Sequence, residues 1–293
     1  MISRWRATVS AAIVLGLALV LTSPTLAQTP TFSTRVEVVR VDVLVTENGR
    51  PVVGLRPTDF EILDNGVRQQ VEFAGLEHMP LNLILALDAS DSVAGVRLEH
   101  LRAASEALLD GLNKGDQAAL VTFNEMLALG SPLTSDLRQV RQAIRAVAPG
   151  GDTALIDALY AGIAIGESDI GRSLLVVFTD GADTASLLRR QVVNDAAKST
   201  DVVVYPVASG LSGRRVTAFL KDVADQTGGR LFEVESTRDA QMAFVGILDE
   251  FRQRYLLSYT PRSVAMSGWH RLEVRVKGRR AAVKARAGYQ AGF

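Results

Sequence analysis

The chain has 293 residues, of which 47% are hydrophobic and 22% charged, a composition typical of a folded globular protein rather than a disordered one. Its 32 Lys and Arg balance its 32 Asp and Glu, so no overall field favours nucleic acid or an anionic membrane. It contains no cysteine, which excludes disulfides, cysteine-ligated metals, a thiol nucleophile and a lipid attached through an N-terminal cysteine.

The N-terminus has the pattern of an export signal. Arg4 and Arg6 precede an apolar stretch at residues 11–21, and small residues follow at 25–27. This stretch is shorter than the ~20 apolar residues that a membrane-spanning helix needs. We therefore expect residues 1–27 to be a cleaved signal peptide and the mature chain to be periplasmic or extracellular, with no integral membrane segment. An uncleaved signal is the alternative.

Residues 28–80 are expected to form a small antiparallel β unit. Apolar side chains alternate up to Asn48-Gly49, and two more apolar runs, at 60–63 and 67–73, flank Asn65-Gly66. Asn-Gly between such runs is the strongest short signal for a β-hairpin. No helical pattern separates these strands, so we predict that they pair antiparallel.

Residues 81–254 show a different pattern, in which strands alternate with helices. This order predicts a Rossmann-like α/β domain with a mostly parallel central sheet and helices on both faces. The expected strands are 81–87, 118–123, 126–129, 174–179, 202–208 and 231–233, and the expected helices are 96–112, 136–147, 154–165, 189–199, 216–227 and 237–254.

After residue 254 the spacing of apolar residues returns to that of strands. Three further strands are expected, at 255–259, 272–276 and 283–286, and their basic residues are interpreted as a solvated strand face. We predict that residues 255–293 pair with residues 28–80, so that the two ends of the chain build one accessory β-sandwich.

Polar residues follow the predicted strands of the α/β domain at three places. The aliphatic run that begins at Leu81 ends in Asp88-Ala89-Ser90-Asp91-Ser92, and two loops contain Gly151-Asp152-Thr153 and Thr179-Asp180-Gly181. In open α/β sheets, ligands bind outside the carboxyl ends of the strands, so these groups are expected to converge. Oxygen donors without His or Cys suit a hard cation such as Mg²⁺.

Read together, these segments resemble the metal-ion-dependent adhesion site of von Willebrand factor A domains. Asp88, Ser90 and Ser92 match its D-x-S-x-S signature, Thr153 matches the threonine after a glycine loop, and Asp180 with the following glycine matches the third element. The segments that flank this domain, residues 39–46, 59–62, 254–261 and 287–289, are similar to the VWFA-related domain family first named from acidobacterial proteins.

The resemblance implies a role for each metal-site residue. Ser90 and Ser92 would ligate the ion directly, Thr153 would join when a ligand binds, and Asp88 and Asp180 would hold waters and hydroxyls in place. A carboxylate from a protein partner would fill the open position. The ion is expected to be Mg²⁺, with Mn²⁺ or Ca²⁺ as alternatives.

Five neighbouring residues are candidates for ligand binding around this ion: Asp91, Gly151, Asp152, Gly181 and Asp183. Asp91 occupies a spacer position where many relatives have glycine, and its charge leaves the identity of the metal open. Asp183 fits a solvated turn residue better than it fits a ligand.

Each motif also has a purely structural interpretation. The serines can cap the helix at 96–112, Asp152 or Thr153 can cap the helix at 154–165, and Asp180-Gly181 can be a simple turn. In that case the chain is a structural or envelope-associated module with a degenerate, metal-free site.

Enzymatic function is not expected. The three histidines are far apart, and the chain lacks G-x-S-x-G, G-x-x-x-x-G-K and a G-x-G-x-x-G after the first strand of the α/β domain. Asp88 and Asp180 with a metal-bound water would suit hydrolysis, but no general base is evident. The sequence therefore predicts an exported, non-enzymatic protein-interaction module that does not bind nucleic acid.

Overall fold

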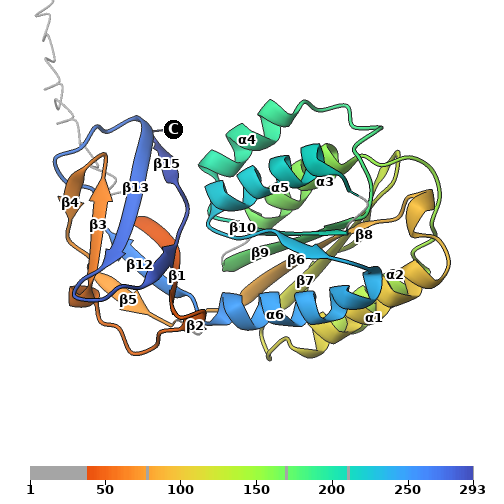
Figure 1. Ribbon diagram of the computed structural model, residues 1–293, viewed down its shortest axis with the longest axis horizontal. Coiled ribbons are helices and arrows are strands. Elements are labelled where there is room, and N and C mark those ends of the chain that lie inside the picture. The colour runs from red at the N-terminus through yellow and green to blue at the C-terminus, as the bar shows by residue number, and fades with distance from the viewer. Residues whose placement is uncertain (1–37, 77–78, 169–170, 210–211, 293) are drawn as a thin grey trace, which may run out of the picture. The chain divides into compact units, whose positions relative to one another are not determined.

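The computed structural model describes residues 38–76, 79–168, 171–209 and 212–292 (Figure 1). The predicted signal peptide lies outside these ranges. Within them, no helix combines the length and the apolar character needed to cross a membrane.

A six-stranded sheet forms the centre of the α/β part. Its order is β11-β10-β9-β6-β7-β8, and neighbouring strands are parallel except for the antiparallel pair β7 and β8. The strands are β6 (Leu81–Asp88), β7 (Gln117–Phe123), β8 (Leu127–Thr134), β9 (Arg172–Thr179), β10 (Val203–Ser209) and β11 (Phe232–Val234). The two central strands, β6 and β9, are buried along their whole length, which confirms the predicted mostly parallel sheet.

Helices cover both faces of this sheet (Figure 1). One face packs α1 (Val96–Asp110), α2 (Leu137–Ala146) and α6 (Ala240–Arg252), and the other packs α3 (Leu155–Gly166), α4 (Arg190–Ser199) and α5 (Arg214–Thr227). Successive β6 side chains point to opposite faces, so Leu83, Leu85 and Leu87 join the first core while Ile84 and Ala86 join the second. The predicted helices are therefore confirmed as two covering layers.

Strands from residues 39–75 and 255–291 form the expected β-sandwich. One sheet contains β14-β1-β12-β5, with β2 also paired to β1, and the other contains β15-β13-β3-β4. Their bounds are β1 (Val39–Glu47), β2 (Arg50–Pro51), β3 (Phe60–Asp64), β4 (Val67–Gln69), β5 (Phe73–Gly75), β12 (Tyr255–Tyr259), β13 (Gly268–Val276), β14 (Ala282–Lys284) and β15 (Gly288–Ala291). N-terminal and C-terminal strands pair directly, β1 with β12 and β3 with β13, around a common apolar core.

Both predicted Asn-Gly hairpins are present. Asn48 and Gly49 have φ values of 51° and 75°, and Asn65 and Gly66 have values of 48° and 82°. Positive φ at both central residues is the geometry of a type I′ turn, whose twist matches that of the paired strands. These turns connect β1 to β2 and β3 to β4.

Several predicted boundaries are wrong. The strand expected at 67–73 is split into β4 and β5, which belong to different sheets, and four strands follow residue 254 instead of three. β8 extends to Thr134 because it is an edge strand and tolerates the exposed Pro132. The helix expected from residue 237 begins with the 3₁₀ turn Thr237–Asp239.

Two buried arginines join the sandwich to the α/β part. Arg254, which is fully buried, donates to the Tyr205 hydroxyl over 2.8 Å, to the Gly228 carbonyl over 2.6 Å and to the Asp42 carbonyl over 3.2 Å. Arg172, at the start of β9, pairs with the Asp42 carboxylate on β1. Arg254 therefore links strand β10 and the residue after α5 to strand β1 of the sandwich.

Candidate metal centre

Asp88 closes strand β6 and organises the loop that follows it. One carboxylate oxygen accepts from the Ser90 backbone N–H over 3.0 Å, and the other accepts from the Thr179 hydroxyl over 2.8 Å. Burial raises the pKa of Asp88 above its ordinary value, and nearby Asp180 also raises it, whereas the hydrogen bonds from Ser90 and Thr179 act in the opposite direction. Asp88 thus ties the loop after β6 to the end of β9.

The two signature serines face Asp180. The hydroxyls of Ser90 and Ser92 lie 2.9 Å apart, and the Ser92 hydroxyl donates to Asp180 Oδ1 over 2.5 Å. Ser90 and Asp180 are buried, whereas Ser92 is exposed, so the cluster opens to solvent at Ser92. The second oxygen of Asp180, Oδ2, is buried and accepts no hydrogen bond from the residues that the structure describes.

The loop that carries Thr153 lies against the same cluster. The Asp91 N–H donates to the Gly151 carbonyl over 3.0 Å, which ties this loop to the D-x-S-x-S turn. A Cβ built on Gly181 would lie 3.5 Å from the Thr153 hydroxyl and 3.9 Å from the Ser92 hydroxyl. Residues from the three predicted loops are therefore brought together at one edge of the sheet.

The capping interpretation of these residues is wrong. Helix α1 has Gly95 at its N-cap, and no side chain caps either α1 or α3 from the N-cap position. The backbone N–H of Ile156, in the first turn of α3, instead donates to the hydroxyl of Ser186 over 3.0 Å and to Asp183 Oδ1 over 3.3 Å. The Asp183 carboxylate also accepts from Ser186, so its contacts serve the start of α3 rather than the serine cluster.

Three exposed acidic residues belong to the loops that carry the cluster or contact them. Asp91 and Asp152 are exposed, as is Glu125, whose Oε2 accepts from the Asp152 N–H over 3.1 Å. Gly151 has a φ of 77°, a left-handed backbone conformation that favours glycine, and the Glu125 carboxylate lies over this position. Nothing in the sequence pattern near residue 125 indicates this contact.

Arg97 is a second residue that the sequence motif does not include. Its Nη1 donates to the Ser92 carbonyl over 2.6 Å and lies 3.7 Å from Asp180 Oδ2. A signal for it exists in the sequence, because a cation is unfavourable in the first turn of a helix and α1 begins at Val96.

The donor set fits a hard divalent cation. Three hydroxyls and two carboxylates converge, and the buried Asp180 Oδ2 accepts no hydrogen bond from the described residues, so a cation could bind it directly. Among the residues that the structure describes, no three His, Cys, Asp or Glu side chains form a metal-holding group. Any ion at this edge would therefore depend on hydroxyl ligands together with Asp180.

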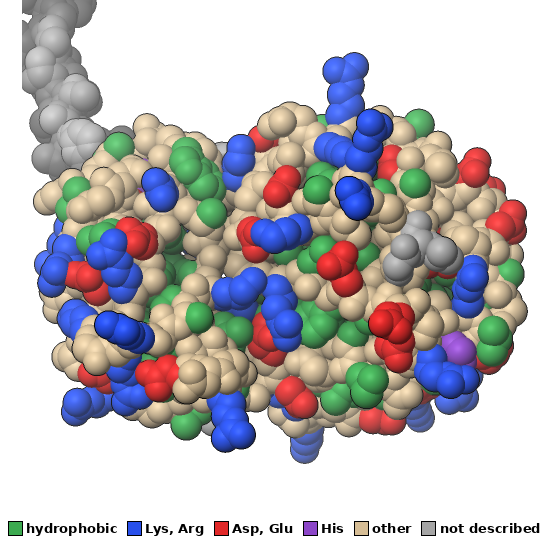
Figure 2. Space-filling view, viewed as in Figure 1, with side chains coloured by type: hydrophobic (Ala, Val, Ile, Leu, Met, Phe, Trp, Pro, Cys, Tyr) green, Lys and Arg blue, Asp and Glu red, His purple; other side chains and the backbone are tan. Residues whose placement is uncertain are grey.

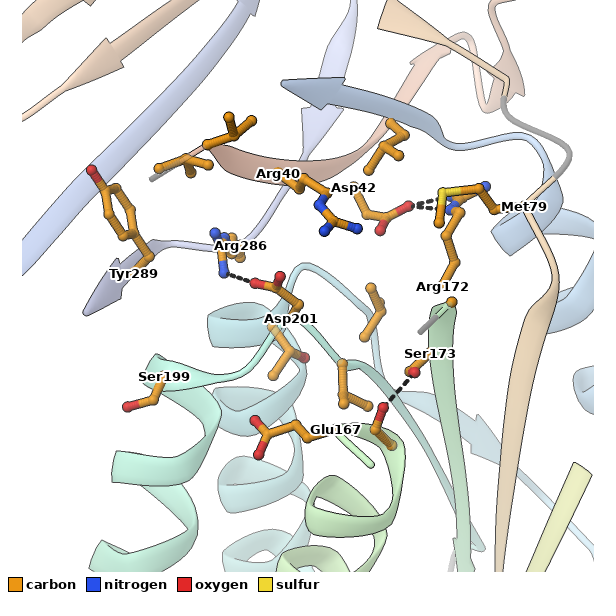
Figure 3. A pocket seen from close by; sticks show the side chains of 18 of the residues that line it. Arg40, Asp42, Met79, Glu167, Arg172, Ser173, Ser199, Asp201, Arg286 and Tyr289 are labelled. Carbon is orange, nitrogen blue, oxygen red and sulfur yellow. Dashed lines mark hydrogen bonds and ion pairs between the residues drawn. The ribbon is translucent and has the colours of Figure 1, made fainter. Parts of the chain in front are cut away.

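A separate cavity lies at the opposite edge of the sheet (Figure 3). It has a volume of about 440 Å³ and is lined by residues at the starts of β9 and β10 and by residues of the sandwich, including Arg40 and Asp42. The ion pairs Arg172–Asp42 and Arg286–Asp201 lie in its wall. None of the candidate metal-site residues lines this cavity, so it gives a hydrolytic site at Asp88 and Asp180 no substrate pocket.

Fold and site together define an α/β domain whose parallel sheet presents a hydroxyl and carboxylate cluster at the carboxyl ends of its strands. The family model of the von Willebrand factor type A domain matches residues 82–245, more than half of the chain. The chain belongs to this family, which confirms the resemblance seen in the sequence.

Curated relatives include heavy chains of the inter-alpha-trypsin inhibitor. Heavy chain H3 of Mesocricetus auratus is 21% identical over 192 residues, which are 60% of this chain and 21% of that protein. Heavy chain H4 of Homo sapiens is 24% identical over 201 residues, which are 64% of this chain and 22% of that protein. This chain spans about a fifth of the length of these relatives.

Solved structures share the fold at low sequence identity. Proximal thread matrix protein 1 from the mussel byssus, solved with a zinc-occupied MIDAS motif, superposes with a TM-score of 0.54 and 17% identity over 65% of this chain and 50% of that chain. A von Willebrand factor type A protein from Catenulispora acidiphila has a TM-score of 0.54 and 11% identity over 89% of this chain and 74% of that chain.

Proposed function

We propose that this chain is an exported protein-interaction module that binds its partner through a divalent cation. The cation would be held by Asp88, Ser90, Ser92, Thr153 and Asp180. The observation that carries this proposal is the buried Asp180 Oδ2, which accepts no hydrogen bond from the described residues and has Arg97 Nη1 3.7 Å away as a counter-charge, beside a cluster of converging hydroxyls. A buried carboxylate oxygen without a hydrogen bond is costly, and a cation bound directly to it would remove that cost.

The ligand chemistry favours recognition over catalysis. Ser90, Ser92 and Thr153 are neutral donors, so an ion held by them keeps much of its positive charge. Mg²⁺ retains exchangeable positions readily, and a partner's Asp or Glu carboxylate can fill one. Because Ser92 is the exposed member of the cluster, the partner would approach from its side.

The comparisons and the surface support this assignment. The mussel protein with zinc in its MIDAS motif shows that the fold accommodates a divalent ion at such a motif. For this chain we favour Mg²⁺, with Mn²⁺ or Ca²⁺ as substitutes, because the candidate donors are all oxygens. Acidic and basic side chains are interspersed over the face in Figure 2, a pattern that suits a protein partner better than nucleic acid.

Export and domain organisation complete the proposal. Residues 1–27 would be removed as a signal peptide, and the mature chain would act in the periplasm or outside the cell. Residues 81–254 would carry the binding site, and residues 28–80 with 255–293 would form the supporting β-sandwich.

Metal-dependent stability of the exported, purified protein tests the proposal. At a concentration of 100 times its Kd, a ligand stabilises the folded state by about 2.7 kcal/mol. For a chain of this size, 1 kcal/mol corresponds to about 2–4 °C, so Mg²⁺ or Mn²⁺ should raise the melting temperature by about 5–10 °C. EDTA should reverse the shift, and Ser90→Ala and Asp180→Asn should abolish it.

Matched controls separate this proposal from its alternatives. Ser199→Ala, on the surface of α4, should keep the full metal response. A wild type whose melting temperature ignores divalent ions would support the structural or envelope-associated module instead. Hydrolysis of simple ester or phosphate substrates that Ser90→Ala abolishes would show a metal-dependent hydrolase. Pull-downs from envelope extract with Mg²⁺ or with EDTA test for a metal-dependent partner.

A further inference from the structure

Arg97 lies beside the candidate cation site, at a helix position that is unfavourable for a positive charge. It is the second residue of α1, and the first turn of a helix carries partial positive charge. Its guanidinium nevertheless turns toward the site, where Nη1 donates to the Ser92 carbonyl over 2.6 Å. Negatively charged groups of the site can therefore offset the unfavourable position of the Arg97 charge.

Asp180 is the group that compensates this charge. Arg97 Nη1 lies 3.7 Å from Asp180 Oδ2, a distance that makes an ion pair but not a hydrogen bond. The Asp180 side chain is 1% exposed, whereas that of Arg97 is 45% exposed. A buried, negatively charged carboxylate is thus paired with a cation that can move into solvent.

We propose that Arg97 is a built-in competitor of the divalent cation. In the cation-free protein it neutralises Asp180, and when an ion binds, the guanidinium must give up this pairing and remain near a second positive charge. The inference rests on the proposed function, because it requires that a cation binds at Asp180. Arg97 would lower the affinity of the site, so that the site fills only at high divalent concentration.

Mn²⁺ titrations of the exported protein by calorimetry test this inference. Arg97→Gln keeps a long polar side chain but removes the charge, and it should bind Mn²⁺ about tenfold more tightly than the wild type. Arg97→Lys keeps the charge and should stay near the wild-type affinity. The gain in Arg97→Gln should shrink as salt is raised from 50 to 500 mM, because salt screens the repulsion between Arg97 and the ion.

Arg138→Gln serves as a control for the loss of one positive charge. β8 is antiparallel to β7, so α2, which carries Arg138 in its first turn, begins at the opposite edge of the sheet from the candidate site. Arg138 is almost fully exposed. This variant should bind Mn²⁺ with wild-type affinity.

Thermal unfolding provides a second measurement, in which Arg97→Gln should have opposite effects without and with metal: a lower melting temperature in EDTA and a larger metal-induced rise in Mn²⁺. In EDTA, Arg97→Gln should melt below the wild type, because Asp180 loses its counter-charge. In saturating Mn²⁺ its metal-induced rise in melting temperature should exceed that of the wild type. Adding Ser90→Ala to Arg97→Gln should remove the tight binding, which places that binding at the proposed site.

The possible failures are distinguishable. If the wild type binds Mn²⁺ but Arg97→Gln binds equally or more weakly, Arg97 only positions the Ser92 carbonyl, and this inference alone is overturned. If neither protein binds Mn²⁺, the proposed metal site fails and the inference fails with it. Tight binding by Arg97→Gln together with undetectable binding by the wild type would support both.

Discussion

A buried carboxylate holds the two sheets of the β-sandwich together. Asp64, at the end of β3, is fully buried, and its Oδ2 accepts from the hydroxyls of Tyr259 over 2.9 Å and Tyr289 over 2.8 Å. Its Oδ1 lies 2.7 Å from Nδ1 of buried His270. Tyr259 belongs to the opposite sheet, so Asp64→Ala removes polar contacts both between and within the sheets.

The loss of stability follows from the groups that Asp64→Ala leaves without a partner. Each buried polar group without a hydrogen bond costs about 1–3 kcal/mol. Two tyrosine hydroxyls and one imidazole nitrogen are affected, and partial relaxation around the new cavity should limit the total to about 3–5 kcal/mol. Asp64→Asn keeps the shape and one acceptor oxygen, so it should cost less, about 1–2 kcal/mol.

Urea unfolding followed by two probes measures this loss. The chain has two tryptophans, and one of them, Trp5, lies in the predicted signal peptide, so fluorescence of the mature protein reports on Trp269 of β13 in the sandwich. Far-UV circular dichroism reports mainly on the helices of the α/β part. The exposed Glu273→Ala on β13 is the control and should change stability by less than about 0.5 kcal/mol. A loss below about 1 kcal/mol in Asp64→Ala would refute the reasoning.

Two further predictions concern groups buried in or beside the sandwich. Burial, together with Asp64, raises the pKa of Tyr259 and Tyr289 above that of the unfolded chain, about 10. Stability should therefore be intact below pH 10 and fall as the pH rises above it; Tyr289→Phe should make that fall shallower in urea unfolding, and an unchanged slope would contradict the assignment. Arg254→Met removes the buried donor to Tyr205 and Gly228 and should cost about 3–5 kcal/mol. Its fluorescence and dichroism transitions should also separate, whereas coincident transitions would show that Arg254 does not couple the two parts.

The layers of the fold could be predicted because local patterns specify them. Runs such as Leu83–Leu87 need a sheet covered on both faces, and the two Asn-Gly turns need positive φ values that few other residue pairs accept. Strand β15 was missed because it is short and its place depends on tertiary contacts. A Cβ on Gly288 would lie 2.1 Å from the His270 carbonyl oxygen, a constraint that only the paired strands reveal.

The candidate site was predictable only in part, for a similar reason. Asp88, Ser90 and Ser92 lie within five residues, so their spacing is visible in the sequence, and the strand order then brings Asp180 beside them. Glu125 and Arg97 belong to no such spacing. Their relation to the site comes from how the β7–β8 turn and the start of α1 fold over the sheet edge.

Asp88 and Asp180 have different roles at this edge of the sheet, as their hydrogen bonds indicate. Each oxygen of Asp88 accepts a hydrogen bond from the protein, one from Ser90 and one from Thr179, and these bonds fix the loop after β6. Among the described residues, Asp180 accepts one such bond, from Ser92, and its second oxygen pairs only with the half-exposed Arg97, 3.7 Å away. Asp88 would therefore hold the loop and the hydroxyls in place around a cation, whereas Asp180 would offer the cation its second oxygen. A metal ion and Arg97 would therefore compete for Asp180, and Asp88 positions the serine loop beside Asp180 through its hydrogen bonds to Ser90 and Thr179.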